Sequence, residues 1–204
     1  MIIEMQEHSA ASRYFMMTQT VLPRPIAWVM TMNEDGGYNL APFSYFNCIS
    51  SDPPLVMISV GRQDDGRDKD THRNLRERRF CTVHIASEQH LDAVNASAET
   101  LAINESELDK IGLDTTLFGE HPVPRLSDCH VAFACELADI HAVGNTPQAV
   151  IYLEIKQMFI DDDIVSTQDN GRIKVHADRL RPLSRMGAGE YMGFGGVMDR
   201  ERPA

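Results

Sequence analysis

The pattern of hydrophobic and polar positions first predicts a hairpin. Residues 25–32 are mostly apolar and contain strong strand formers, and residues 33–37 have the Asn, Asp and Gly composition of a turn. The return limb, residues 38–48, is rich in aromatic and apolar side chains. Proline has no N–H to give to a strand ladder, so Pro42 predicts either an edge strand or a local break, with a kink near this position.

More segments further along the chain have the composition of strands. The runs 55–60 and 80–85 are short and rich in β-branched residues, which is typical of buried strands. Apolar residues alternate through 129–137, which gives the segment one apolar face, and 150–155 continues in the same style. The pattern therefore predicts about five or six strands at irregular spacing.

Helical segments lie between these strands without alternating regularly with them. Asp70 and Thr71 can cap a short helix that runs through Arg79, and serines can open two further helices over 87–98 and 106–111. A doubly wound fold is disfavoured because it needs regular alternation of helices and strands. We expect a mainly β fold, an antiparallel barrel or sandwich with a helical insertion.

The composition is that of an ordinary globular protein. The 204 residues are 43% hydrophobic and 24% charged. A chain of this length can bury a large core without disulfides or a structural metal. We expect a single domain over residues 1–204, in which the last few residues of the Gly- and Arg-bearing tail 187–204 are disordered.

The charge balance disfavours nucleic acids. The 19 basic and 30 acidic side chains leave a formal net charge of −11, and such a surface repels phosphate polymers. The same charge argues weakly against anionic membranes, but it permits a small anionic ligand where local donors override the mean field. No apolar run approaches the roughly 20 residues of a membrane span, and the first residues lack the regions of a signal peptide. A cytoplasmic protein is therefore expected.

The cysteines form neither a disulfide nor a metal pattern. No CxxC pair occurs, and in a reducing compartment these residues are more typical of buried thiols: Cys48, Cys81, Cys129 and Cys135. Cys81 and His84 would fall on opposite faces of a strand, so zinc is disfavoured. A hydrolase is also disfavoured because there is no GxSxG motif, although a dispersed triad stays open.

The stretch Lys69-Asp-Thr71 is a candidate anion site. At a helix start the hydroxyl of Thr71 and the free backbone N–H groups point at one spot, and Lys69 adds a positive charge. A hydrogen bond to a charged group is worth roughly 1.5 to 3 kcal/mol, more than the roughly 0.3 to 1 kcal/mol of the helix dipole, so these two side chains should dominate. The alternative is an ordinary solvated cap, because Asp and Thr are favoured at every helix start.

The segment 39–46 is a candidate for binding a flat ring. The break expected near Pro42 frees backbone groups, and the small residues Ala41 and Ser44 would let a heteroaromatic edge approach the main chain. Nearby candidates for an aromatic wall and a hydroxyl are Trp28 and Thr31. The alternatives are a plain edge strand with a protective proline and a tryptophan that belongs to the core.

Together, these stretches resemble the flavin reductase-like family, whose fold is the FMN-binding split barrel. The resemblance spans about Tyr14 to Tyr191, and its motifs stand in the order and spacing of the family. They are Pro23-Arg-Pro-Ile-Ala-Trp-Val29, Asn39-Leu-Ala-Pro-Phe-Ser44, Asp52-Pro-Pro54, Lys69-Asp-Thr71 with Asn74, and Arg181-Pro-Leu-Ser-Arg185 with Tyr191.

The chain departs from the family pattern in two places. Met30 stands where a small hydroxyl residue is common, and residues 186–190 replace the commoner Leu-Gly-Gly type of run. These departures concern contacts to substrate and nicotinamide more than flavin binding. Arg185 is a ligand or interface residue in one interpretation and a member of a structural ion pair in the other.

The resemblance implies a six-stranded antiparallel barrel with Greek-key topology and a homodimer that holds FMN close to the subunit interface. By position, Lys69 and Thr71 would hold the phosphate, with Ser59 as a weaker candidate. The residues that would border the isoalloxazine are Thr31, Ala41, Pro42, Phe43 and Ser44. No catalytic side chain and no metal are implied, because the cofactor carries the chemistry.

The implied activity is hydride transfer from NADH or NADPH to FMN. Reduced flavin would then pass to a partner oxygenase or reduce a second substrate. Two alternatives stay open from the sequence: a non-enzymatic FMN-binding carrier or electron-transfer protein, and an interaction module without a cofactor.

Overall fold

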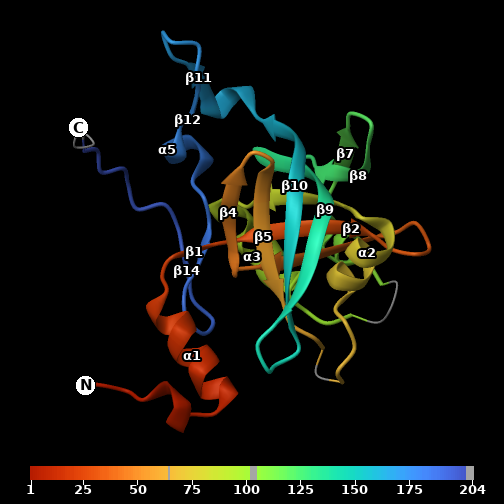
Figure 1. Ribbon diagram of the computed structural model, residues 1–204. Helices are drawn as coiled ribbons and strands as arrows, with labels where there is room; N and C mark the ends of the chain where they lie inside the picture. The colour runs from red at the N-terminus through yellow and green to blue at the C-terminus, as the bar shows by residue number, and fades with distance from the viewer. Residues whose placement is uncertain (64, 102–104, 201–204) are drawn as a thin grey trace.

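The computed structural model describes residues 1–63, 65–101 and 105–200, and its centre is a large antiparallel sheet (Figure 1). Its seven strands lie in the order β3-β2-β6-β9-β10-β5-β4, and every neighbouring pair is antiparallel. The strands are β2 (Ala27–Met32), β3 (Tyr38–Phe43), β4 (Phe46–Ser51), β5 (Pro54–Val60), β6 (Phe80–Ile85), β9 (Val131–Val143) and β10 (Gln148–Ile160). The prediction of a mainly β, antiparallel fold is confirmed.

The sheet curls so that its two ends approach each other. The end strands β3 and β4 are consecutive in the chain, and between them the carbonyl of Tyr45 accepts a hydrogen bond from the N–H of Ser59 in β5 (2.9 Å). The sheet has seven strands where the resemblance implied six, because the return limb of the hairpin is divided between β3 and β4. This division opens the curled sheet along one edge.

The break in the return limb lies after Pro42 and not at it. Pro42 pairs with Trp28 inside the regular β2–β3 register, and β3 continues to Phe43. Because β3 is an edge strand, its outer side has no neighbour for which a proline would remove a hydrogen bond. The edge-strand prediction is confirmed, while the kink lies at residues 44–45.

Three smaller sheets surround the large one. β1 (Arg24–Pro25), β13 (Ser184–Arg185) and β14 (Tyr191–Met192) form a three-stranded sheet, drawn to the left of the large sheet in Figure 1. The two hairpins are β7 (Thr115–Phe118) with β8 (His121–Leu126), and β11 (Val165–Thr167) with β12 (Ile173–Val175).

The helices are short, and the predicted ones are present. The helix predicted from Asp70 is α2 (Asp70–Arg78), with Lys69 at its N-cap and Arg79 in the left-handed region after it. The helical insertion consists of the 3-10 helix η2 (Glu88–His90), α3 (Leu91–Ala96) and α4 (Glu107–Ile111). The others are η1 (Met5–Glu7), α1 (Ala10–Thr20), η3 (Asp162–Ile164) and α5 (Ala177–Leu180). None of the helices in the described residues is long and apolar enough to cross a bilayer.

Strand β2 is buried on both faces, because it separates two hydrophobic clusters. Val29 belongs to the core inside the curled sheet, together with residues such as Ile58, Val83 and Leu153. Trp28 belongs to the outer core beneath the helical insertion, where its Nε1 donates to the Ser97 hydroxyl (2.8 Å). Trp28 is completely buried, so it is a core residue and not the wall of a binding site.

The four cysteines are free thiols, and three of them are buried as expected, whereas Cys48 is exposed. Cys81 and Cys135 lie opposite each other in the register of β6 and β9. Burial raises the pKa of Cys81 and that of Cys129, so both remain protonated at neutral pH. The disordered end predicted for the tail falls on residues 201–204, which lie outside the described residues.

His84 is a completely buried side chain that links three strands. Its Nε2 accepts the N–H of Leu126 in β8 (2.9 Å), and its Nδ1–H therefore donates to the carbonyl of Trp28 in β2 (3.0 Å). Both ring nitrogens have a partner only when the imidazole is neutral. Burial lowers the pKa of His84 from 6.5 to about 4.

We predict that His84 makes the protein less stable in mild acid. Between pH 6.5 and about 4 the unfolded chain binds a proton that the folded chain excludes, so the free energy of unfolding decreases as the pH falls through this window. Across the whole window, this decrease in the free energy of unfolding amounts to about 3 kcal/mol. Urea unfolding at several pH values should show a shallower pH dependence for His84→Gln than for the wild type and a His8→Gln control. Equal slopes in all three proteins would contradict the assignment.

Candidate flavin site

A cavity of about 350 Å³ lies where the curled sheet is open, and we call it the main cavity. Its lining comes from α1, the strands β3, β5, β10, β13 and β14, the start of α2, α3, and the link between β1 and β2. A smaller side pocket of about 90 Å³ shares Pro42, Phe43, Lys69 and Ala98 with it. The site therefore lies between segments that are far apart in the sequence.

The lining of the main cavity is positively charged. Arg62, Lys69 and Arg185 line it, and no Asp or Glu does among the described residues. The chain as a whole has a formal net charge of −11, so the charge of the cavity lining is opposite in sign to that of the whole protein. Such a reversal favours an anionic ligand.

The same cavity has aromatic walls. Its aromatic lining residues are Tyr14, Phe43, Tyr45 and Tyr191, and the rings of Tyr14 and Tyr45 lie 6.1 Å apart between centroids. Burial raises the pKa of Tyr45, so its phenol stays neutral. Concave sites with apolar and aromatic walls and a few polar groups are typical of cofactor sites.

The structure brings most of the predicted site residues to these two cavities. The main cavity is lined by Pro42, Phe43, Ser44, Ser59 and Lys69. Ala41 and Thr71 line the side pocket, together with Lys69. Thr31 lines neither cavity and is completely buried, so the expected contact between Thr31 and a flavin ring has no geometric basis.

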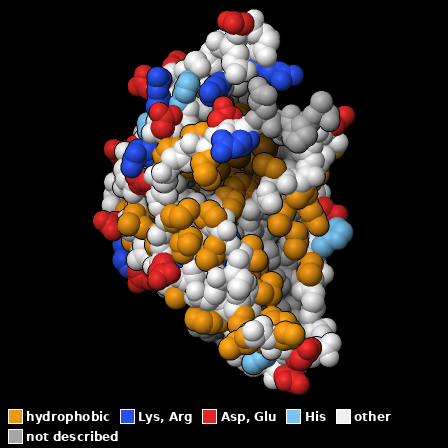
Figure 2. Space-filling model, turned by 90° about the vertical axis from the view of Figure 1, so that its left-hand side faces the viewer, with side chains coloured by type: hydrophobic (Ala, Val, Ile, Leu, Met, Phe, Trp, Pro, Cys, Tyr) orange, Lys and Arg blue, Asp and Glu red, His pale blue; other side chains and the backbone are white. Residues whose placement is uncertain are grey.

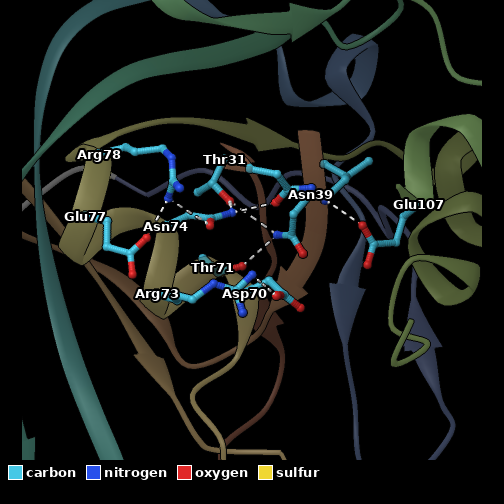
Figure 3. Close-up of polar contacts among 11 residues, drawn as sticks. Thr31, Asn39, Asp70, Thr71, Arg73, Asn74, Glu77, Arg78 and Glu107 are labelled. Atoms are coloured by element: carbon cyan, nitrogen blue, oxygen red, sulfur yellow. Dashed lines mark hydrogen bonds and ion pairs between the residues drawn. The ribbon is translucent and has the colours of Figure 1, made fainter. Parts of the chain in front are cut away.

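Thr31 and Thr71 instead belong to a buried network of amides and hydroxyls (Figure 3). The Nδ2 of Asn74 donates to the hydroxyl of Thr31 (3.1 Å) and to Oδ1 of Asn33 (2.8 Å). The Nδ2 of Asn39 donates to the hydroxyls of Thr71 (3.0 Å) and Thr31 (3.4 Å). The network fastens the first two turns of α2 to β2 and β3.

Lys69 is positioned by this network without belonging to it. It occupies the N-cap of α2, and its ammonium group has no hydrogen-bond or ion-pair partner in the described parts of the chain. The adjacent carboxylate of Asp70 is paired with the guanidinium of Arg73. A free cation therefore stands beside the unsatisfied N–H groups of a helix start, an arrangement that attracts anions.

Ser59 and Arg62 lie on the same side of the main cavity as Lys69. Gln148 donates from Nε2 to the hydroxyl of Ser59 (3.0 Å), which leaves the serine proton free for a ligand. Arg62 is paired with Asp68 (3.3 Å), and Arg76 contacts the other oxygen of that carboxylate (2.9 Å). The charge of Arg62 is thus partly balanced.

The sequence analysis missed Asn33 and Glu107, and it did not assign a role to Asn39. Glu107 from α4 lines the side pocket and accepts the backbone N–H of Leu40 (2.9 Å). Burial raises the pKa of its carboxyl group. Asn39 and Asn74 had a sequence signal, because each stands in a motif of the family resemblance, whereas Asn33 and Glu107 had none.

Ser87, His90 and Asp128 have the residue types of a hydrolytic triad, but their geometry is that of a helix cap. The N–H of Ser87 donates to Nδ1 of His90 (3.1 Å), so Nε2 carries the ring proton and faces Asp128 (3.2 Å). Ser87 is buried and is the N-cap of η2. These contacts among Ser87, His90 and Asp128 therefore fix the start of the helical insertion.

The same geometry argues against a metal at this cluster. Potential ligand atoms of His90, Asp128 and Cys129 lie within 4.8 Å of one another. The Nε2–H of His90 donates a hydrogen bond to Asp128, which lowers the pKa of that carboxyl group. Burial raises the pKa of the Cys129 thiol, which is therefore protonated. A metal at this cluster would have to displace both protons.

Comparison with known proteins agrees with this geometry. Residues 17–175 match the model of the flavin reductase like domain. An uncharacterized protein of Halalkalibacterium halodurans, BH2278, is 35% identical over 96% of this chain and 93% of its own length. The chain belongs to the flavin reductase-like family, a family of flavin-related oxidoreductases.

Solved structures share the fold over nearly the whole chain. Nitrilotriacetate monooxygenase component B from Bacillus cereus superposes with a TM-score of 0.90 and 29% identity, covering 98% of both chains. The 2-nitrobenzoate 2-nitroreductase NbaA of Pseudomonas fluorescens superposes with a TM-score of 0.88 and 28% identity, covering 100% of this chain and 96% of its own. The fold is therefore the split barrel of this family.

Proposed function

We propose that this protein is an NAD(P)H-dependent flavin oxidoreductase that binds FMN in the main cavity. The proposal rests on the aromatic and cationic residues that line this cavity, in a chain that belongs to the flavin reductase-like family. Aromatic walls suit a flat ring, and three cations without a carboxylate among the described lining residues suit a phosphate. The residues present thus fit the cofactor.

Lys69 and Ser59 are the residues that would hold the phosphate. Lys69 is an exposed cation without a partner among the described residues, and it lies beside the positive end of α2. The Ser59 hydroxyl has a free proton. Thr71 is only 1% exposed and accepts from Asn39, so it supports the phosphate site by holding the helix start in place.

The segment from Ala41 to Ser44 would border the isoalloxazine. This is the edge of the sheet, where the strand β3 ends and the chain crosses to β4, so its backbone groups have open sides. The side chains of Pro42 and Phe43 line both cavities. They would exclude water from one face of the ring.

Bound FMN supplies the hydride acceptor, and the chain supplies binding, orientation and a dry surface. No residue lining the main cavity is arranged as a general acid or base among the described residues. The catalytic contribution of the chain would therefore be to hold the nicotinamide close to the bound flavin. Component B of a monooxygenase is among the similar proteins, which supports a partner oxygenase as one destination of the electrons.

We predict that Lys69→Ala weakens FMN binding about tenfold to a hundredfold, because one hydrogen bond to a charged group is worth roughly 1.5 to 3 kcal/mol. Riboflavin has no phosphate, so its affinity should change little. Titration of the apoprotein with both flavins, followed by fluorescence, measures the difference. Lys174→Ala removes an exposed lysine of β12, far from the cavity lining, as the control. An equal loss for the two flavins in Lys69→Ala would refute the phosphate assignment.

We also predict that NADH or NADPH bleaches the absorbance of bound FMN under anaerobic conditions. Stopped-flow mixing of the loaded protein with each nucleotide should show reduction within the time of a turnover, with free FMN as the control. Tight flavin binding without reduction faster than that of free FMN would support the alternative function, a non-enzymatic electron-transfer or carrier protein.

A homodimer is part of the proposed function. Helix α1, the two residues after it and the outer strand β4 expose large apolar side chains: Tyr14, Phe15, Met17, Val21, Leu22 and Ile49. Figure 2 shows hydrophobic side chains spread over one face of the molecule. Tyr14 also lines the main cavity. Exposed apolar side chains in such number are typical of a subunit interface.

We predict that light scattering gives the mass of a dimer for the wild-type protein. Phe15→Glu should shift the equilibrium towards the monomer because it places a charge in the buried interface. Leu117→Glu in β7, an exposed apolar position outside this set of residues, should leave the dimer intact. A wild-type monomer at all concentrations would remove the proposal.

A further inference from the structure

The main cavity has a further cation, Arg185, which comes from a different sheet than the elements around Lys69. Arg185 lies in β13 and lines the cavity together with Tyr191 of β14 and Asn95 of α3. In Figure 1 the sheet of β1, β13 and β14 is drawn to the left of the large sheet, and α2 is drawn to the right. The flavin proposed above has one phosphate, and it is assigned to the Lys69 side.

Arg185 has a second arginine as its partner on the neighbouring strand. Arg24 and Arg185 are direct partners in the antiparallel register of β1 and β13. Arg24 is only 5% exposed, and its guanidinium donates to the carbonyls of Thr18 (2.7 Å) and Met186 (2.7 Å). Like charges directly opposite each other on paired strands are destabilising, and neither arginine has an ion-pair partner among the described residues.

The guanidinium of Arg185 is held in a fixed orientation. It stacks on the ring of Tyr191 at 4.4 Å from the centroid, and it donates to the carbonyls of Glu190 (3.3 Å) and Ala188. An arginine has five N–H donors, and the others have no acceptor within the described chain. A planar fork with free donors matches a carboxylate, which it can bind in a bidentate manner.

Two neighbouring polar groups complete the arrangement. The phenol of Tyr191 donates to Oδ1 of Asn95 (3.2 Å), which orients the amide of Asn95 and leaves its NH₂ without an acceptor in the described structure. The hydroxyl of Ser44 lies 3.4 Å from Nε of Arg24 and also lines the cavity. Ser44 therefore connects the buried charge of Arg24 to the cavity surface.

We propose that Arg185, with Asn95 and the buried charge of Arg24 behind Ser44, binds the carboxylate of an aromatic acid, and that aromatic carboxylates are the class of second substrate presented to the flavin. This inference rests on the proposed function, since it places the acid beside bound FMN. The ring of the acid would lie among Tyr14, Tyr45 and Tyr191, which line the same cavity. The carboxylate supplies the ion-pair partner that Arg185 lacks among the described residues.

The test compares benzoate with benzamide, which has nearly the same size and shape but no charge. Each is titrated into the FMN-loaded protein and followed by the change in the flavin spectrum. We expect benzoate to bind about tenfold or more tightly than benzamide in the wild type, because a charged hydrogen bond contributes roughly 1.5 to 3 kcal/mol. Arg185→Gln should remove this preference and leave the affinity for benzamide within about twofold.

Two further variants make the result specific. Arg185→Lys keeps the charge but not the planar fork, so it should restore only part of the preference for benzoate. Arg172→Gln removes the same charge from an exposed residue in the turn of the β11–β12 hairpin, outside the cavity lining, and should bind like the wild type. Thermal melts confirm that each variant is folded before it is titrated.

Three results would overturn the proposal. Equal affinities for benzoate and benzamide in the wild type would show that the site does not recognise a carboxylate. A preference that survives in Arg185→Gln would place the recognition elsewhere. Weaker binding of FMN but not of riboflavin in Arg185→Gln would assign this arginine to the flavin phosphate.

The two proposals can fail separately. If the wild-type protein binds no FMN, the proposed function is wrong. Calorimetric titration of the flavin-free protein then tests the anion site alone, and benzoate binding that is lost in Arg185→Gln would still support that site. If FMN binds and benzoate does not, the proposed function stands and this inference is wrong.

Discussion

The structure of the site depends on the hydrogen-bond network that ties α2 to β2 and β3. Two asparagine amides, Asn39 and Asn74, each donate to two acceptors in a region from which water is excluded. Leaving one of these buried groups unpaired would cost about 1 to 3 kcal/mol, so the network allows one position for the helix start. Lys69 precedes the helix directly, and its place at the cavity follows from this constraint.

The network also divides the residues of the motif into two kinds. Thr71 and Asn74 point into the protein and hold the helix, whereas Lys69 remains exposed at the cavity. The surroundings of Lys69 and Arg185, two cations that line the main cavity, also differ. Around Lys69 the helix start supplies free N–H groups, while Arg185 is oriented by Tyr191 and by backbone carbonyls. A chain with a large negative net charge thereby maintains a cavity that attracts anions.

Several features could be predicted from the sequence because they depend on local chemistry. The strands 55–60 and 80–85 and the helix from Asp70 are all present, since strand formers and caps act over a few residues. The edge position of β3 followed from Pro42. The location of the break did not follow, because an edge strand tolerates a proline on its open side and the chain leaves the sheet only where it crosses to β4.

For the candidate site too, the sequence predicts local features but not contacts between distant segments. The sequence alone determined that Lys69 stands at a helix start and that Pro42, Phe43 and Ser44 lie at a strand edge, because these properties depend on neighbours in the chain. Only the tertiary structure decided that Thr31 is buried in the network and that Arg185 lines the cavity. These facts depend on which segments pack together: Thr31 meets Asn74, and Arg185 meets Arg24. The residues next to a position in the chain do not determine which distant segment packs against it.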